Sequence, residues 1–439
     1  MTNLPDKAVY KARRDRLFEQ LPEGSVVLLV GNREQVRNKN ITYPFRQDHD
    51  FYYLTGYAEP DAVAVLRPNC EQPFILFNQP KDEYQEVWFA GRTGQEGAVS
   101  LYGADAAYDI AELESRLPTL FGERPYVFYS DELGRFNHRI FDWLACQRKS
   151  AKFDEVKSFK HLMNVLPRTQ NMRRVKDEHE IGLLRKAVEA SVSGHRHLMR
   201  LCQPGQTEQA LTGEFFNHVS QFGCSDVGYP TIMAAGNNAC CLHYSENRDV
   251  LQNGQMLLVD AGGDYQYYTA DITRTYPVNG KFTPEQRDIY QLVLASLDAA
   301  IETVKPGVSW NSMYPAAMSV LAQGLLDLGI LSGSFDQVME QELYKPFTLH
   351  KTGHWLGLDV HDVGAYHDDN GNWVTLEPNM VFTIEPGLYF PEHSKNVDPR
   401  WRGMGVRLED DILVTPSGYE NLSVGAPRSI GDIEALMAK

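Results

Sequence analysis

The sequence has no apolar run approaching the roughly 18–20 residues that a helix needs to cross a lipid bilayer. Its first residues, MTNLPDKAVYKARRDRLFEQ, form a charged amphipathic pattern. An export signal would instead show a basic segment, an apolar core and a cleavage site. We therefore expect no membrane insertion and no export, and predict a cytoplasmic protein.

Cysteine is scarce, with six in 439 residues, and no two of them form a CxxC pair. This usage predicts reduced, mostly buried thiols rather than a disulfide framework. The neighbours Cys240 and Cys241 could suggest a zinc site. Adjacent side chains in a strand point to opposite faces, however, so we favour a structural role for both.

An excess of positive charge is also lacking, because the net charge is −16. This argues against a nucleic acid or an anionic membrane as partner. Residues 1–174 carry 24 Lys+Arg and 24 Asp+Glu, whereas residues 175–439 carry 18 and 34, so 18 − 34 gives the whole net charge. The acidic second part is either simply well solvated or gathers carboxylates around a metal.

The length predicts two domains. In residues 1–174, strand-like runs at 25–30, 62–67, 73–77 and 125–129 alternate with helical patterns near 6–21, 107–117 and 137–147. This alternation predicts an α/β domain. A proline and polar residues around 165–175 predict a linker.

Residues 175–439 have a different pattern, which predicts an α+β domain. Helical patterns near 177–202, 207–222, 284–303 and 309–328 are separated by strand pairs at about 228–276 and 346–415. Two helices followed by strands, twice over, indicate an internal duplication, although no self-similarity in the sequence proves it.

Two aspartates lie in an apolar hairpin pattern, QMLLVDAGGDYQYYTADITRTYPV (255–278). A turn centred on Tyr265–Gln266 would place Asp260 opposite Asp271, with Cβ atoms about 4.5–5.5 Å apart. Like charges at that separation destabilise a hairpin unless a cation lies between them. We therefore favour a metal site over a turn cap and a solvated aspartate, whereas Asp264 is expected to cap the turn.

Two glutamates lie in similarly apolar surroundings. Glu385 follows a strand pattern in MVFTIEPGLYF (380–390), where a buried ionised carboxylate needs a partner. In GVRLEDDILVT (405–415), period-two alternation places Arg407 and Glu409 on one face. Glu409 is thus either a metal ligand or half of an ordinary surface ion pair.

Histidines cluster in HKTGHWLGLDVHDVG (350–364), which contains His350, His354 and His361, and His243 lies in ACCLHYSEN. The cluster could be chance loop composition, but imidazole is the usual nitrogen ligand and proton donor near neutral pH. Four acids and a histidine suit two adjacent divalent metals, with Mn²⁺ or Co²⁺ preferred over structural zinc. The sequence contains no P-loop, HExxH or GxSxG with triad partners, so a metallohydrolase is the chemical class that remains.

Taken together, these segments resemble a known family. Asp260, Asp271, His354, Glu385 and Glu409, in this order, resemble the dinuclear site of the "pita-bread" metallopeptidases, which include methionine aminopeptidase, prolidase and aminopeptidase P. The similarity extends over MRRVKDEHEI, GYPTIMAAGNNAC and VRLEDDILVT. HWLGLDVHDVG resembles bacterial aminopeptidase P, and YPFRQDHDFYYLTGYAEPDAVAVLRP (43–68) resembles the creatinase-like N-terminal domain of that family.

The resemblance implies an α/β creatinase-like domain over residues 1–174 and an α+β pita-bread catalytic domain over 175–439, with a pseudo-two-fold internal duplication. It also implies release of the N-terminal residue from peptides with proline in the second position, by attack of a hydroxide that bridges two metals, with Mn²⁺ expected. Asp260 would bind one metal and His354 the other. Glu385 would help to hold the latter, and Asp271 and Glu409 would bridge the two.

The resemblance assigns further roles. The catalytic residues it implies are His361, His243 and Glu385. His361 would hydrogen-bond the substrate and assist proton transfer, while His243 and His350 would line the pocket for the proline ring and the scissile carbonyl. Arg407 would anchor its neighbouring glutamate or the peptide downstream of proline, and Tyr389 would support the site from behind.

Trp88, in QEVWFAGRTG, would by resemblance reach the active site of a neighbouring subunit in a homo-oligomer, a tetramer or a dimer. A core aromatic of the N-terminal domain is equally compatible with the sequence. Two alternative functions remain open: a prolidase, which acts on Xaa-Pro dipeptides with the same metals, and a non-catalytic pita-bread binding module. The second is disfavoured because all five ligands are present.

Overall fold

The computed structural model describes residues 6–89, 91–122, 124–130, 134–150 and 159–438. The chain forms two compact units, Met1–Gln170 and Asn171–Lys439. The division falls inside α6 (Leu166–Arg174), a helix where we predicted a linker. The boundary between the units thus lies within the predicted linker, and this linker is helical because Pro167 occupies the first turn of the helix, where a missing N–H breaks no hydrogen bond.

The first unit is built on a mixed six-stranded sheet with the order β6-β5-β4-β1-β7-β8. Its strands are β1 (Ser25–Val30), β4 (Val63–Leu66), β5 (Phe74–Asn78), β6 (Ala106–Asp109), β7 (Tyr126–Ser130) and β8 (His161–Asn164). A small hairpin, β2 (Val36–Asn38) with β3 (Ile41–Thr42), lies apart from it. Strand β1 pairs antiparallel with β4 and parallel with β7, which places the most apolar strand at the centre.

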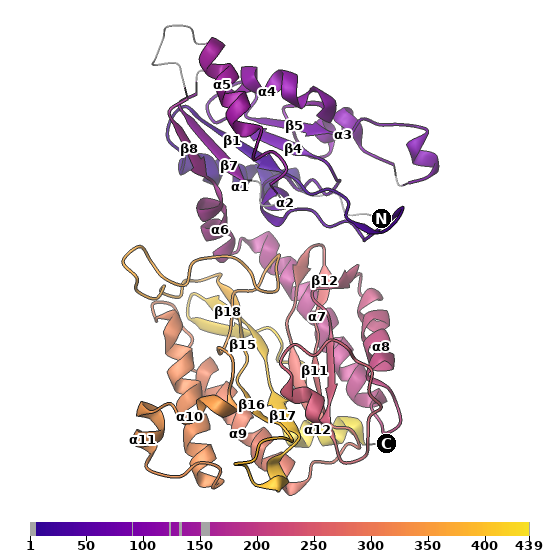
Figure 1. The fold of residues 1–439 in the computed structure, drawn as a ribbon, viewed down its shortest axis with the longest axis vertical. Helices are drawn as coiled ribbons and strands as arrows, with labels where there is room; N and C mark the ends of the chain where they lie inside the picture. The colour runs from indigo at the N-terminus through magenta and orange to yellow at the C-terminus, as the bar shows by residue number, and fades with distance from the viewer. Residues whose placement is uncertain (1–5, 90, 123, 131–133, 151–158, 439) are drawn as a thin grey trace. The chain divides into compact units, whose positions relative to one another are not determined.

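Helices cover this sheet (Figure 1). They are α1 (Lys7–Glu19), α2 (His49–Thr55), α3 (Gly94–Ser100), α4 (Leu113–Phe121) and α5 (Ile140–Ser150). Alternate residues of β1, among them Val26 and Leu28, form a core with Leu117 of α4 and Trp143 of α5. The helix predicted near 107–117 begins later, because its first residues pair as β6 with β5. Pairing with β5 has therefore outweighed the local helical preference of these residues.

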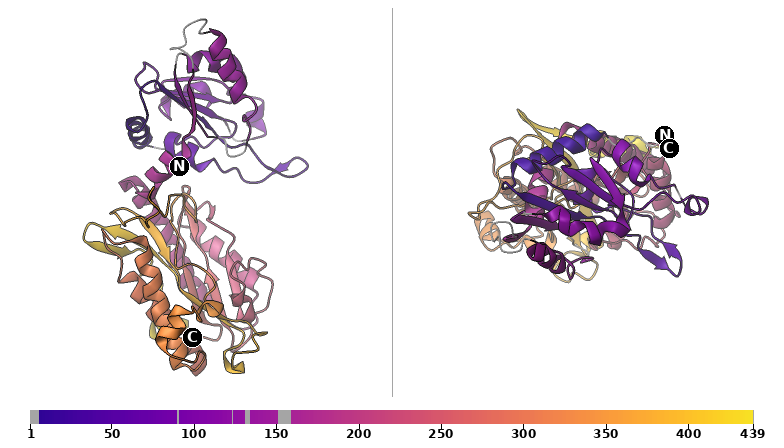
Figure 2. Two further views of the ribbon diagram at one scale, coloured as in Figure 1. Left: turned by 60° about the vertical axis from the view of Figure 1, so that its left-hand side comes forward. Right: turned by 90° about the horizontal axis from the view of Figure 1, so that it is seen from above.

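The second unit alternates helix pairs with short antiparallel sheets. Its helices are α7 (Glu178–Leu201), α8 (Glu208–Ser220), α9 (Pro284–Ile301), α10 (Met313–Asp327), α11 (Phe335–Glu340) and α12 (Ile430–Met437). Both α7 and α9 begin with a capping box, formed by Asp177 with Glu180 and by Thr283 with Gln286. Helices α9 and α10 pack side by side (Figures 1 and 2).

The sheets of the second unit have the orders β10-β11-β14, β13-β12-β9, β15-β18-β19 and β16-β17. The strands of its first half are β9 (Asp226–Val227), β10 (Ile232–Ala235), β11 (Met256–Asp260), β12 (Gly263–Tyr265), β13 (Tyr268–Thr269) and β14 (Thr273–Pro277). Those of its second half are β15 (Val381–Ile384), β16 (Gly387–Phe390), β17 (Met404–Arg407), β18 (Asp410–Thr415) and β19 (Gly418–Asn421). Two helices followed by antiparallel strands thus occur twice, as the sequence pattern predicted.

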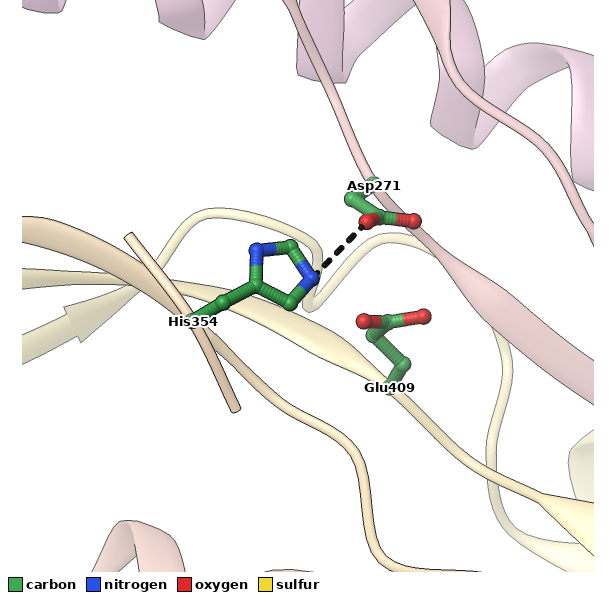
Figure 3. A group of neighbouring side chains, drawn as sticks. All are labelled: Asp271, His354 and Glu409. Carbon is green, nitrogen blue, oxygen red and sulfur yellow. Dashed lines mark ion pairs between the residues drawn. The ribbon is translucent and has the colours of Figure 1, made fainter. Parts of the chain in front are cut away.

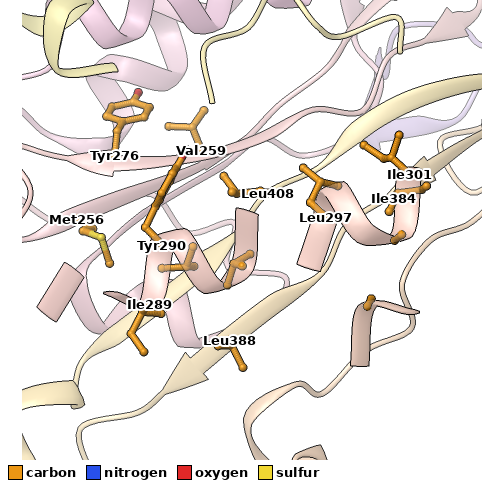
Figure 4. Packing of buried hydrophobic residues seen from close by; sticks show 14 of the residues in the cluster. Met256, Val259, Tyr276, Ile289, Tyr290, Leu297, Ile301, Ile384, Leu388 and Leu408 are labelled. Atoms are coloured by element: carbon orange, nitrogen blue, oxygen red, sulfur yellow. The ribbon is translucent and has the colours of Figure 1, made fainter. Parts of the chain in front are cut away.

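The two halves of this unit share one hydrophobic core (Figure 4). Side chains of β11 and β14, such as Val259 and Tyr276, pack with Tyr290 and Leu297 of α9 and with Leu408 after β17. Thr273 of β14 also forms a β-bridge with Glu409. The halves are therefore joined both by apolar packing and by backbone pairing close to the predicted metal ligands.

A buried arginine fixes this junction. Arg274 is fully buried, and its guanidinium donates to Asp410 Oδ1 at 2.6 Å and to the backbone carbonyl of Glu409 at 2.7 Å. Burial in a low-dielectric interior makes such a charge costly unless its partner is kept. The Arg274 cation holds the pKa of Asp410 below its usual value despite the opposing effect of burial.

We expect Arg274→Met to lower the free energy of unfolding in urea by about 3 kcal/mol or more, because it leaves Asp410 buried without its main partner. Arg185→Met is the matched control, since Arg185 pairs with Glu420 at the surface. That change should cost less than about 1 kcal/mol. Equal, small losses in both variants would show that the buried pair does not hold the halves together.

Candidate metal centre

The five predicted metal ligands meet in one cavity of about 650 Å³ in the second unit. The residues that line it include Asp260, Asp271, His354, Glu385 and Glu409, together with His243, His350, His361 and Arg407. These side chains come from segments that lie far apart in the sequence. The fold therefore brings together the acids and histidines that the sequence pattern singled out.

The two aspartates lie where two strands leave their sheet. Asp260 ends β11 and pairs with Thr273, so the predicted register, with Asp260 opposite Asp271, was wrong by two residues. The turn is centred on Gln266 and Tyr267, whose positive φ values suit a tight hairpin. Because side chains alternate with period two, a slip of two residues keeps Asp271 on the same face as Asp260.

Tyr229 links the two aspartates, and sequence reasoning missed it. Its hydroxyl lies 2.7 Å from Asp260 Oδ1 and 2.6 Å from Asp271 Oδ1. A phenol has one proton to donate, so it satisfies only one of these carboxylates at a time. The motif GYPTIMAAGNNAC contains Tyr229, but nothing in its spacing from Asp260 indicates this contact.

The two glutamates come from the second half. Glu409 follows β17, and its backbone N–H donates to the Thr273 carbonyl while its Oε2 accepts from the Thr273 hydroxyl at 2.6 Å. Glu385 follows β15, and its N–H donates to the Thr352 carbonyl. Backbone hydrogen bonds thus fix the position of both residues, and the Thr273 hydroxyl also orients the carboxylate of Glu409.

His354 faces the acids through Nε2 (Figure 3). Its Nδ1 lies 3.0 Å from the Trp355 carbonyl, which fixes the tautomer with the proton on Nδ1 and leaves Nε2 as a ligand atom. Nε2 lies 3.4 Å from Asp271 Oδ2 and 3.7 Å from Glu385 Oε1. Within the described chain, Asp271, His354 and Glu409 offer ligand atoms that all lie within 4.8 Å of one another.

A glycine allows this histidine to approach its strand. A Cβ atom on Gly353 would lie 1.9 Å from the carbonyl oxygen of Thr383 in β15. No side chain fits there, so the backbone next to His354 pairs closely with β15, and the Thr383 N–H donates to the His354 carbonyl at 2.9 Å. Gly353 is therefore required for the position of His354.

The acids repel one another strongly. Burial and the nearby charge of Asp260 raise the pKa of Asp271 well above its usual value. Burial, followed by the charges of Asp271 and Asp260, does the same to the pKa of Glu409. The pKa of Glu385 rises to about 8 through burial and the charge of Glu409. Without a cation, these carboxylates cannot all stay ionised at neutral pH.

Arg407 supplies only part of the compensation. Its Nη2 lies 2.5 Å from Asp260 Oδ2, and its Nη1 donates to the Tyr389 hydroxyl at 3.1 Å. The Tyr389 hydroxyl lies 2.7 Å from His350 Nε2. Burial lowers the pKa of His350 to about 4, with Arg407 as the next cause, so this imidazole is neutral. Arg407, Tyr389 and His350 thus form one hydrogen-bonded row beside the acids.

His361 and His243 line the same cavity. The ring of His361 lies 4.3 Å from that of His354, and burial together with the His354 charge lowers the pKa of His361. Its loop is held by the next residue, Asp362, which accepts from Arg173 at 2.5 Å and from Lys176 at 2.7 Å, all three being buried. This network comes from the segment MRRVKD, which the sequence pattern placed in a linker.

Trp88 belongs to the first unit, where its side chain is 67% exposed. Exposure on that scale is inconsistent with the reading of Trp88 as a core aromatic. Neighbouring Val87 and Phe89 are similarly exposed, so this segment presents apolar side chains to its surroundings.

The donor set fits divalent cations. Four carboxylates and the His354 imidazole face a single cavity, and the positively charged side chains among its described lining residues are Arg407 and Lys351. Oxygen-rich ligation with one nitrogen is typical of catalytic first-row metals rather than structural zinc. The acids repel one another, and Tyr229 has only one proton to share between two carboxylates. Both features favour a bound cation.

Comparison with known proteins agrees with this geometry. The model of metallopeptidase family M24 matches residues 182–416, and that of the aminopeptidase P N-terminal domain matches residues 10–129. The chain belongs to the M24 metallopeptidases. Together the two matches cover both units and confirm the predicted creatinase-like and pita-bread folds.

Several M24 relatives match over nearly their whole length. The Xaa-Pro aminopeptidase of Escherichia coli strain K12 is 37% identical, and the match covers 98% of this chain and 97% of the relative. The Xaa-Pro aminopeptidase of Haemophilus influenzae is 38% identical, and the match covers 100% of this chain and 98% of the relative. The solved structure of aminopeptidase PepP from Pseudomonas aeruginosa has a TM-score of 0.96 at 39% identity, covering 99% of this chain and 98% of its own. The predicted resemblance to aminopeptidase P is confirmed.

The raised acid pKa values give a pH prediction for metal-stripped protein. The folded-state pKa of Glu385, about 8, lies above its unfolded value, so its contribution to stability is full below about pH 4.3 and is lost as the pH rises to 8. We expect the Tm of stripped protein to fall by roughly 5–10 °C between pH 5 and 8. Mn²⁺ should restore it most at pH 8, because a cation replaces the proton.

Glu385→Gln is the matched control for this scan. The variant keeps the side-chain shape but cannot ionise, so its Tm should depend less on pH over the same interval. A wild-type Tm that falls no more than that of the variant between pH 5 and 8 would contradict the predicted repulsion.

Proposed function

We propose that this protein is an Xaa-Pro aminopeptidase that removes the N-terminal residue from peptides with proline in second place, using two divalent metal ions. The observation that carries the proposal is the convergence of four acids and His354 in one cavity with three further histidines. Full-length relatives named Xaa-Pro aminopeptidase support it. We further propose residues 1–174 as the N-terminal domain and 175–439 as the catalytic domain.

Proline explains why a specialised site is needed. The bond before proline is a tertiary amide without an N–H, and the ring fixes φ near −65°. A peptidase that recognises this N–H or an extended chain there cannot bind it. A cavity with histidine rings and apolar walls, such as Ile232, Leu242 and Val360, offers the proline ring a surface that requires no donor from the peptide.

We assign roles to side chains by their chemistry and place. Asp260, Asp271, His354, Glu385 and Glu409 would hold the ions. Divalent ions in such a site polarise a carbonyl and lower the pKa of water. His361 lies at the exposed edge of the cavity, where its imidazole can exchange a proton with the reacting groups, and burial lowers its pKa.

The row behind the acids orients the substrate. His350, neutral and hydrogen-bonded to Tyr389, lines the cavity, and His243 lines the same space. Arg407 forms an ion pair with Asp260 and offsets part of the negative charge of the cavity. We propose Mn²⁺ as the native metal because oxygen-rich ligation suits it. We also propose a cytoplasmic homo-oligomer, a tetramer or a dimer, in which exposed Trp88 meets another subunit.

The sharpest test compares two peptides. Metal-stripped protein should release glycine from Gly-Pro-Ala only after addition of Mn²⁺, and should leave Gly-Pro nearly uncleaved. Chromatographic analysis of released glycine measures both rates. Cleavage of the dipeptide alone would identify a prolidase, and cleavage of neither peptide would favour a non-catalytic binding module.

Single substitutions separate the ligands from the proton donor. Asp271→Asn or Glu409→Gln should abolish turnover and reduce metal content while leaving the fold intact, because each removes a charge shared by the cavity. His361→Ala should lower kcat by about 10²–10⁴-fold with metal content unchanged. Metal analysis of each purified variant supplies the control. Full activity of Asp271→Asn would disprove the ligand assignment.

A further inference from the structure

A second cavity lies beside the metal centre in the catalytic unit. It has a volume of about 650 Å³ and shares His350, Lys351, Gly353 and Tyr366 with the first cavity. His350, Lys351 and Gly353 thus form a wall common to both cavities.

Aromatic rings form the floor and sides of the second cavity. Trp310, Tyr314, Tyr366 and Trp373 line it. Trp310 is held in place by Trp355 and Tyr366, whose ring centroids lie 4.2 and 5.0 Å away. Trp373 is 37% exposed, and its ring centroid lies 4.1 Å from that of His367 in a tilted arrangement, so part of the indole remains accessible. Rigid aromatic walls favour an apolar or aromatic guest.

The charges of the second cavity differ from those of the first. Its one lining acid, Glu342, pairs with Lys345 at 2.5 Å. Lys351, on the shared wall, has no ion pair with any described residue, and its Nζ lies 6.0 Å from the centroid of Tyr366. Lys351 thus offers an unpaired positive charge at the boundary between the two cavities.

The position of the cleaved bond gives the direction of a bound peptide. The proposed activity places the bond before proline at the metal centre, so only one residue of the substrate lies upstream of it, and a carboxylate downstream of proline is attracted by Lys351. The end of the peptide that carries the carboxylate is the end beyond proline. The second cavity has no unpaired acid to receive an N-terminus, so it faces the downstream part of the chain.

We propose that the second cavity binds the residues after proline, and that it favours a large aromatic or apolar side chain directly after proline with a carboxylate within reach of Lys351. This inference rests on the proposed aminopeptidase function and adds to it a preference for the residue directly after proline.

The test compares Gly-Pro-Phe with Gly-Pro-Ala as substrates of the Mn²⁺-loaded enzyme. Wild-type kcat/KM should be higher for Gly-Pro-Phe by about tenfold, the effect of burying one large apolar side chain. Trp373→Ala should remove most of this ratio, and Trp373→Phe should keep it. Phe216→Ala, which removes an exposed aromatic on α8, is the matched control and should leave the ratio unchanged.

Lys351 is tested with the free acid and the amide of Gly-Pro-Phe. Wild type should prefer the free acid, and Lys351→Gln should lower this preference at least threefold, while Lys305→Gln, an exposed lysine elsewhere, should not. A Trp373→Ala variant that keeps the full Phe-to-Ala ratio would overturn the aromatic part of the inference. A Lys351→Gln variant that keeps the full acid preference would overturn the electrostatic part.

Binding of the product Pro-Phe separates this inference from the proposed function, because it needs no turnover. Calorimetry should show that Trp373→Ala weakens binding of Pro-Phe about tenfold relative to Pro-Ala. If wild type cleaves no peptide but this difference is present, the proposed function is wrong and the pocket stands. If wild type cleaves Gly-Pro-Ala but the difference is absent, the pocket assignment is wrong and the function stands.

Discussion

The mutual repulsion of buried carboxylates is the constraint on which the catalytic unit depends. Asp260, Asp271, Glu385 and Glu409 share one cavity, and burial raises the pKa of three of them. A fold held together by apolar packing alone would gain nothing from placing four acids together. Their convergence becomes favourable when cations neutralise them, so metal binding and stability are coupled in this unit.

The duplicated architecture explains how the acids come together. Asp260 and Asp271 belong to the first half of the unit, and Glu385 and Glu409 to the second. The halves meet where Thr273 pairs with Glu409, so both the backbone and the Thr273 hydroxyl set the distance between the two pairs. Buried Arg274 stabilises the same junction through hydrogen bonds to Asp410 and to the backbone carbonyl of Glu409. Relative movement of the halves would therefore disturb the ligands at once.

The metal ligands could be predicted from the sequence because charged residues stand out in otherwise apolar strand patterns. It recovered β1, β4, β5 and β7 nearly residue for residue, since buried strands read as short apolar runs. The register of Asp260 was missed because two consecutive positive-φ residues, Gln266 and Tyr267, moved the turn. Because the register differs from the prediction by an even number of residues, Asp260 and Asp271 still lie on the same face.

Other features could not be read from the sequence. Tyr229 and the Asp362 network act across long separations in the chain, and no local pattern encodes such contacts. The helix α6 was hidden by Pro167, which is as compatible with a first helical turn as with a linker. The second cavity combines residues from 310 to 373 whose individual signals are ordinary core and loop composition.

Counting metal ions and protons tests the central claim most directly. Calorimetric titration of stripped protein with Mn²⁺ at pH 7, repeated in two buffers of different ionisation enthalpy, gives both numbers. Repulsion between the buried acids predicts two ions per chain, with release of protons from the acids whose pKa is raised. Stripped protein that binds no Mn²⁺, or binds it without proton release, would contradict the account.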